Sequence, residues 1–181
     1  MKKVRIGVIG LGAVGSRVAL SCNDLGMEVI GYDPYLSHNR VLELKADIRM
    51  VENLEELWGE CDFITIHTPL NQETRGMISR EAISKMKDGV IIINNSRGQL
   101  IVEQDLADAL NSGKVYAAGL DVLSSEPVKG DNPLLKAKNC IITPHISWAP
   151  KESRQRILDT SAANLKAYLD GRPINVVNGV D

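Results

Sequence analysis

The chain alternates between short, almost purely apolar runs and longer amphipathic segments. Most of the apolar runs contain no polar alternation, which is typical of strands covered on both faces within a parallel sheet. Seven runs of this kind predict seven strands, at residues 4–10, 28–32, 47–50, 63–67, 90–94, 117–122 and 140–143.

Helical segments lie between these runs. Three of them stop directly before a glycine: residues 13–25 before Gly26, 102–112 before Gly113, and 151–170 before Gly171. Glycine suits the left-handed residue that follows many helices. Asn53, with Glu56 three positions later, resembles a capping box at the start of another helix.

Strands that alternate with helices in this way predict an α/β domain of the Rossmann type, a doubly wound parallel sheet. No linker, repeat or low-complexity segment interrupts the alternation. We therefore expect residues 1–181 to form a single domain.

Composition narrows the class of protein. The chain has 181 residues, 44% apolar and 24% charged, which is ordinary for a soluble globular domain. A net charge of −2 gives no electrostatic attraction to nucleic acid or to an anionic membrane. No apolar run approaches the roughly 20 residues that span a bilayer. The apolar start resembles a signal peptide, but glycines interrupt it and no small-residue cleavage pattern follows.

The cysteines indicate a reducing compartment. Cys22, Cys61 and Cys140 are odd in number, far apart and outside any CxxC pair. This spacing argues against a disulfide framework and a zinc site, and it favours buried, reduced thiols in a cytoplasmic protein. The three histidines are also widely separated, so we expect no metal site.

The segment "GLGAVG" follows the first predicted strand and opens the first predicted helix. A GxGxxG pattern alone is weak, but this position makes it specific for a dinucleotide site. Gly10 would allow the tight turn, Gly12 would let the backbone approach a pyrophosphate, and Gly15 would let the helix pack close to the strand. The helix N-terminus would then face the phosphates.

Asp33 is the acid expected near the end of the second strand, 18 positions after Gly15. Its carboxylate would accept hydrogen bonds from the adenosine ribose and repel a 2′-phosphate, which favours NAD over NADP. The alternative is that Asp33 and Pro34 only form a turn. Arg40 would blur the cofactor preference if it folds back toward this site.

Three further segments end predicted strands, at the edge where such sheets bind ligands. "INNSRGQL" contributes Arg97, "GLDVLSSEP" contributes Glu126, and "TPHISWAP" contributes His145. A guanidinium suits a carboxylate or carbonyl oxygen, and histidine exchanges protons near neutral pH. A glutamate beside the histidine would favour the imidazolium. The alternatives are a surface arginine, an ordinary loop glutamate, and a histidine that caps the last helix or fills the core.

These segments together resemble the D-isomer-specific 2-hydroxyacid dehydrogenases. The resemblance covers nearly the whole chain, in the family's order of motifs. It rests on "GLGAVG", "YDPY", "HTPLNQETRGMI", "INNSRGQLIVEQDLADAL", "GLDVLSSEP", "NPLL" and "TPHISWAP". Trp148 and the "ESRQRI" after it look most like glycerate dehydrogenases, also called hydroxypyruvate reductases. "GYDPYLS" looks equally like 3-phosphoglycerate dehydrogenases.

The resemblance implies a reaction and a set of site residues. Arg97 would hold a 2-oxo acid, His145 would protonate its carbonyl oxygen as hydride arrives from NADH, and Glu126 would orient the histidine. The cofactor-binding set that it implies is Gly10, Gly12, Ala13, Val14, Gly15, Asp33, Thr68, Pro69 and Asp121, with Asp121 at the nicotinamide end.

Family members carry a substrate lobe before the glycine-rich strand, and this sequence begins at that strand. We therefore expect a cofactor domain without its partner lobe, able to bind NAD but nearly inactive alone. A homodimer is compatible with the resemblance. Two alternatives stay open: a non-catalytic NAD-binding module like the dehydrogenase-related corepressors, and a relative acting on an amino acid or formate.

Overall fold

The computed structural model describes residues 4–36, 43–44 and 46–179. In chain order its elements are β1 (Arg5–Ile9), α1 (Ala13–Asp24), β2 (Glu28–Tyr32), β3 (Ile48–Met50), α3 (Leu54–Trp58), β4 (Phe63–Ile66), α4 (Arg80–Lys85), β5 (Val90–Asn94), η1 (Gly98–Leu100), α5 (Glu103–Ser112), β6 (Val115–Leu120), η2 (Pro133–Lys136), β7 (Cys140–Ile142) and α6 (Lys151–Leu169). The chain divides into two compact units, with the boundary between Pro144 and His145. That residues 1–181 act as one domain stays a prediction.

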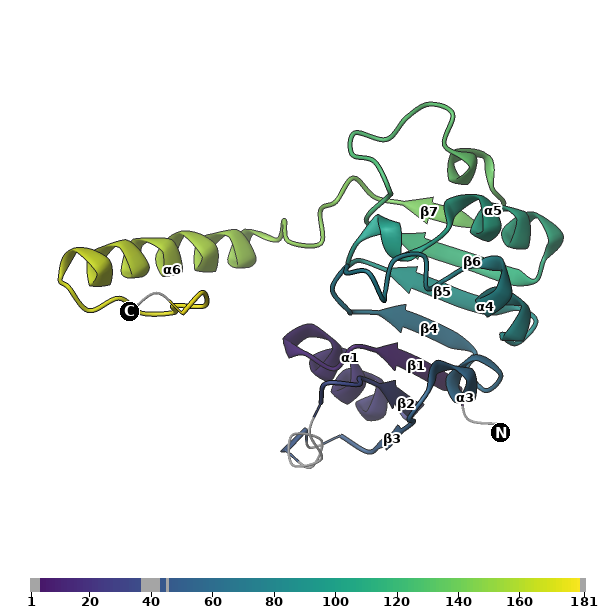
Figure 1. Ribbon diagram of the computed structural model, residues 1–181, viewed down its shortest axis with the longest axis horizontal. Coiled ribbons are helices and arrows are strands. Elements are labelled where there is room, and N and C mark those ends of the chain that lie inside the picture. The colour runs from purple at the N-terminus through teal and green to yellow at the C-terminus, as the bar shows by residue number, and fades with distance from the viewer. Residues whose placement is uncertain (1–3, 37–42, 45, 180–181) are drawn as a thin grey trace. The chain divides into compact units, whose positions relative to one another are not determined.

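The first unit contains a seven-stranded sheet in the order β3-β2-β1-β4-β5-β6-β7 (Figure 1). Every neighbouring pair of strands is parallel. The strand order reverses between β1 and β4, which makes that position the topological switch point of the sheet. The predicted fold class, a doubly wound parallel sheet of the Rossmann type, is confirmed.

Helices pack on both faces of the β1 end of the sheet. Ile6 and Val8 of β1 pack with Ala19 of α1 in the smaller hydrophobic cluster. Ile9 of the same strand joins the larger cluster, which includes buried residues of α3, α4 and α5. This alternation arises because successive strand residues point to opposite faces. The continuous apolar runs of the sequence therefore reflect a strand covered on both sides.

At the β7 end, some apolar side chains of the sheet are exposed. Ile93, Gly119 and Ile141 are register partners on neighbouring strands. Ile93 is 36% exposed and Ile141 is 70% exposed. The helix packed on the smaller cluster, α1, contacts β1 and β2. An apolar run indicates that other elements can pack on both faces of a strand, but it does not identify those elements.

The predicted element ends agree closely with the structure at the glycines. Gly26, Gly113 and Gly171 have φ values of +81°, +85° and +69°, in the left-handed region. The Asn53 side chain accepts a hydrogen bond from the Glu56 backbone N–H at 3.2 Å, as a helix cap does.

Among the strands and α-helices, β6 and α4 differ most from the sequence prediction. Strand β6 begins and ends two residues earlier than the pattern predicted. Helix α4 was not predicted, because it has only six residues and shows too little periodicity; Ser79 caps it by accepting from the Ala82 N–H.

The cysteines are free thiols with different degrees of burial. Cys61 is buried, and this burial raises the pKa of its thiol to about 12. Cys22 and Cys140 are partly buried and pack against the smaller and the larger cluster, respectively, so their burial is less complete than the sequence analysis expected. No helix in the described part of the chain has both the length and the apolar character to cross a membrane.

We expect Leu57→Ala to test the packing of the larger cluster. Leu57 is 0% exposed within it. Its truncation leaves a cavity, so the free energy of unfolding should fall by about 2–5 kcal/mol. Urea unfolding measures the loss. Leu25→Ala, at a leucine that is 80% exposed, is the matched control and should change stability by less than about 0.5 kcal/mol. Equal losses in the two variants would contradict this account of the core.

Candidate functional site

A tight turn joins β1 to α1. Gly10 has a φ of +88° and donates its N–H to the Tyr32 carbonyl at 2.8 Å. A Cβ on Gly15 would lie 1.9 Å from the Gly10 carbonyl oxygen, so α1 can pack this close only with glycine there. A Cβ on Gly12 would meet no atom within 4 Å. The start of α1 therefore faces open space beside the turn.

Asp33 lies against this turn, at the end of the neighbouring strand β2. Its Oδ2 accepts a hydrogen bond from the Leu11 N–H at 2.8 Å, and its Oδ1 accepts one from the Tyr35 N–H at 3.0 Å. The carboxylate thus joins the glycine turn to the loop after β2. This contact is consistent with the position that the sequence spacing predicted for the acid.

A cavity of about 320 Å³ opens where β1, β2 and β4 end. Its lining includes five residues of the predicted cofactor-binding set: Gly10, Gly12, Asp33, Thr68 and Pro69. This is the carboxyl edge of the sheet at its switch point, where doubly wound sheets bind ligands. Residues from three separate motifs of the sequence therefore meet in one cavity.

The other four residues of the predicted set lie elsewhere. Ala13 and Val14 form the first turn of α1, and Gly15 is buried beneath it. Asp121 is buried just after β6 and accepts a hydrogen bond from the Thr143 hydroxyl at 2.5 Å. Their contact with a cofactor stays a prediction.

Sequence reasoning missed several residues that line the cavity. Tyr35, Leu54, His67, Glu73 and Met77 are among them. The sequence could have indicated His67, because this residue directly follows β4 and so lies at the same edge of the sheet as Asp33. No spacing rule in the sequence pointed to Leu54 or Met77, which come from other parts of the chain.

His67 is a partly buried histidine. Burial lowers its pKa, because the charged imidazolium loses hydration. The Thr65 hydroxyl lies 2.9 Å from His67 Nε2. The cavity wall therefore favours a neutral imidazole at neutral pH.

The loops that carry Arg97 and Glu126 contact each other within the first unit. A Cβ on Gly98 would lie 1.9 Å from the Leu123 carbonyl carbon, so the backbones touch at a point that only glycine allows. The Gln99 side chain donates to the Ser124 carbonyl at 2.9 Å. Glu126 Oε1 accepts from the Leu123 N–H at 3.4 Å. Arg97 is exposed, and its guanidinium donates to the Ser96 carbonyl at 2.7 Å.

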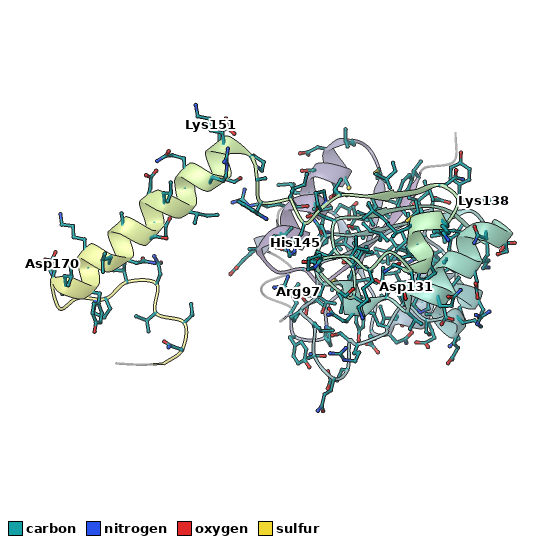
Figure 2. All side chains as sticks on the ribbon, turned by 90° about the horizontal axis from the view of Figure 1, so that it is seen from above. Arg97, Asp131, Lys138, His145, Lys151 and Asp170 are labelled. Carbon is teal, nitrogen blue, oxygen red and sulfur yellow. The ribbon has the colours of Figure 1, made fainter. Side chains whose placement is uncertain are left out.

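His145 begins the second unit, after β7 and before α6. The cap residue of α6 is Pro150, and His145 is exposed, so it neither caps that helix nor fills the core. Its φ of +53° is uncommon for a residue with a side chain. The Trp148 indole N–H donates to the His145 carbonyl at 2.7 Å. In Figure 2, Lys151 marks the first residue of α6 and Asp170 follows its last residue.

The three predicted catalytic residues are thus divided between the units. Arg97 and Glu126 belong to the first unit and His145 to the second. Their convergence on one substrate, and the coupling of Glu126 to His145, stay predictions. Among the described residues, His, Cys, Asp and Glu side chains do not gather in threes that could hold a metal ion.

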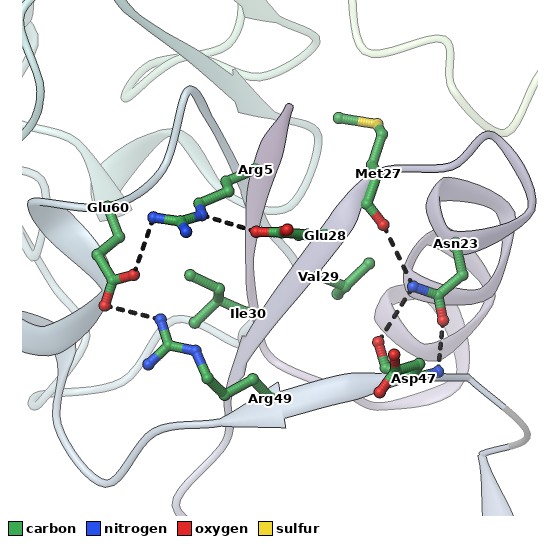
Figure 3. Close-up of a pocket in the computed structure, with 9 residues that line it drawn as sticks. All are labelled: Arg5, Asn23, Met27, Glu28, Val29, Ile30, Asp47, Arg49 and Glu60. Carbon is green, nitrogen blue, oxygen red and sulfur yellow. Dashed lines mark hydrogen bonds and ion pairs between the residues drawn. The ribbon is translucent and has the colours of Figure 1, made fainter. Parts of the chain in front are cut away.

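A second cavity lies at the opposite, amino edge of the sheet (Figure 3). Arg5 pairs with Glu28 at 2.8 Å and with Glu60 at 3.2 Å, and Arg49 pairs with Glu60 at 2.7 Å. The hydrogen bond to Glu28 raises the pKa of Arg5. These charges neutralise one another, and none belongs to a motif that predicted chemistry. We interpret the charged residues that line this cavity as a structural ion-pair network.

The sequence matches a known domain family over most of its length. The model described as "D-isomer specific 2-hydroxyacid dehydrogenase, NAD binding domain" matches residues 1–147. A hydroxypyruvate reductase of Blautia hydrogenotrophica is 60% identical over 173 residues, 96% of this chain and 52% of that protein. A D-3-phosphoglycerate dehydrogenase of Archaeoglobus fulgidus is 41% identical over 95% of this chain and 32% of that protein.

A solved structure also resembles the chain. It is a D-lactate dehydrogenase of Aquifex aeolicus complexed with NAD and lactic acid, with a TM-score of 0.82 and 35% identity. The similarity covers 93% of this chain and 54% of that one. The chain therefore spans about a third to a half of the length of these proteins.

We expect His67 to make stability depend on pH. Its folded-state pKa lies below the usual value near 6.5, so the unfolded chain binds the proton at higher pH. Stability is therefore lost as pH falls through about 6.5 toward the lowered pKa. Urea unfolding at about pH 7.5 and about pH 5.5 should show a smaller loss in His67→Gln than in the wild type. Equal losses would contradict the burial of this imidazole.

Proposed function

We propose that this chain, which belongs to the D-isomer specific 2-hydroxyacid dehydrogenase family and carries its NAD-binding domain, supplies the cofactor half of an NAD-dependent dehydrogenase. The reaction is hydride transfer between NAD(H) and a small 2-oxo or 2-hydroxy acid. The observation that supports it most is the cavity lined by Gly12, Asp33 and Thr68 at the switch point of the sheet.

The residues of this cavity suit a dinucleotide. The open space at Gly12 beside the start of α1 leaves room for a diphosphate near free backbone N–H groups. Asp33 lies next to that turn and would accept from the ribose hydroxyls. The cavity of about 320 Å³ has the size of a small-molecule site.

NADH, when bound, supplies a hydride for a substrate carbonyl carbon. Arg97 would hold the carboxylate and polarise the carbonyl of the 2-oxo acid through its forked donors. His145 would donate a proton to the carbonyl oxygen, and Glu126 would orient that imidazole and favour its protonated form. The exposure of Arg97 and His145 leaves both side chains accessible to a substrate.

For the substrate we propose hydroxypyruvate and glycerate, with 3-phosphoglycerate as the second candidate. This choice rests on the 60% identity to the hydroxypyruvate reductase and the 41% identity to the phosphoglycerate dehydrogenase. Both proteins are longer than this chain. We propose that a substrate lobe completes the site, that the chain alone binds NADH with little turnover, and that the protein acts in the cytoplasm. A homodimer remains a further proposal.

We expect Asp33→Asn to weaken the preference for NADH over NADPH. The variant keeps an oxygen that can accept from the Leu11 N–H, but it removes the charge that repels a 2′-phosphate. In calorimetric titrations of this chain, NADPH affinity should rise about tenfold while NADH affinity changes less. Asp131→Asn, at an exposed loop acid, is the control. An unchanged ratio in Asp33→Asn would remove the role given to this carboxylate.

We expect His145→Gln to impair catalysis without impairing folding. In a protein that joins this chain to a substrate lobe, kcat for hydroxypyruvate reduction should fall by about 10²–10⁴-fold. NADH affinity and the melting temperature should stay close to the wild type, because His145 is exposed. A full rate in the variant would refute the proton-donor role, and a large drop in melting temperature would favour a structural one.

A further inference from the structure

A side-chain hydrogen bond joins two loops at the cavity lined by Gly12, Asp33 and Thr68. The Tyr35 hydroxyl, on the loop after β2, donates a hydrogen bond to Glu73 Oε2 at 2.9 Å. Glu73 lies on the loop after β4, and both residues line the cavity. The same hydrogen bond raises the pKa of Tyr35, because it stabilises the protonated phenol beside a carboxylate.

Glu73 belongs to a loop that its own hydrogen bonds hold in shape. Asn71 Oδ1 accepts from the Glu73 and Thr74 N–H groups, each at 2.9 Å. The Thr74 hydroxyl donates to the Pro69 carbonyl at 2.7 Å. The Glu73 backbone is therefore fixed relative to the cavity wall at Pro69.

The backbone of Tyr35 is fixed by a hydrogen bond to Asp33. Its backbone N–H donates to Asp33 Oδ1 at 3.0 Å, so the tyrosine begins next to the carboxylate that would bind the ribose. The phenol then reaches Glu73. Within the described part of the chain, no donor contacts the second oxygen of Glu73, Oε1.

This step rests on the proposed function, the binding of NAD(H) in this cavity. In the dinucleotide, the adenosine ribose lies between the diphosphate and the adenine base, so the base lies at the end of the cavity that Tyr35 and Glu73 line. The diphosphate would lie at Gly12 and the ribose at Asp33. The base would continue past Asp33, into the part lined by Tyr35, Pro69, Glu73 and Met77. That part offers apolar surface to a flat ring and one carboxylate to its edge.

We propose that Tyr35 and Glu73 recognise the adenine base. Glu73 Oε1 accepts a hydrogen bond from the 6-amino group, and the Tyr35 hydroxyl holds the carboxylate in position through Oε2. An ionised carboxylate can only accept hydrogen bonds. It therefore suits the amino group of adenine and faces the 6-oxo group of hypoxanthine acceptor to acceptor.

The test compares NADH with reduced nicotinamide hypoxanthine dinucleotide, which carries an oxo group in place of the 6-amino group and a hydrogen on the neighbouring N1. Calorimetric titration of this chain should give about tenfold tighter binding of NADH, because hydrogen bonds to charged groups are the stronger ones. Glu73→Gln should bring the two affinities within about twofold, since an amide can both accept from an amino group and donate to an oxo group.

Tyr35→Phe removes the hydroxyl that holds Glu73. It should reduce the preference for NADH to about threefold, through weaker NADH binding. Glu81→Gln and Tyr116→Phe are matched controls at exposed residues outside the cavity lining, and they should keep the wild-type ratio. If Glu73→Gln lowers the melting temperature, the ratio of the two dinucleotide affinities in Tyr35→Phe decides whether these residues recognise adenine.

Equal wild-type affinities for the two dinucleotides would overturn base recognition and leave the proposed cofactor site intact. If Glu73→Gln and Tyr35→Phe both keep the wild-type ratio of the two affinities, recognition of the base by these residues is likewise overturned, and the proposed cofactor site stays intact. A folded wild-type chain that binds neither dinucleotide would refute the cofactor site and, with it, this inference.

Discussion

The two hydrogen bonds accepted by Asp33 hold the candidate site together. One comes from Leu11 inside the glycine turn, and the other comes from Tyr35 on the loop after β2. The turn itself exists because Gly15 lets α1 approach the Gly10 carbonyl. A change in either contact would move the wall against which a diphosphate and a ribose would lie. The base end depends on them too, because Tyr35 reaches Glu73 from a backbone that Asp33 anchors.

Much of this arrangement could be predicted from the sequence because local rules fix it. Glycines mark the ends of α1, α5 and α6 through their positive φ values. The GxGxxG spacing identified the turn, and the position of Asp33 followed from the length of one helix and one strand. The family resemblance, and not a local rule, implied Thr68 and Pro69, which line the same cavity in the structure.

Other features depended on packing between distant segments, which the sequence pattern does not encode. The contact between Tyr35 and Glu73 joins two loops whose meeting depends on the path of the chain after β2 and β4. The exposed row through Ile93 and Ile141 depends on where α1 packs. Arg40, which the sequence suggested as an influence on cofactor choice, lies outside the described residues.

The central claim is that NADH binds at the carboxyl edge of the sheet, between the glycine turn and Asp33. The direct test is a series of backbone amide NMR spectra of this chain with increasing NADH. We predict that the largest shifts occur at Gly10, Gly12, Asp33 and Thr68, with Arg49 at the amino edge unchanged. Shifts concentrated at the amino edge, or none at saturating NADH, would contradict the account.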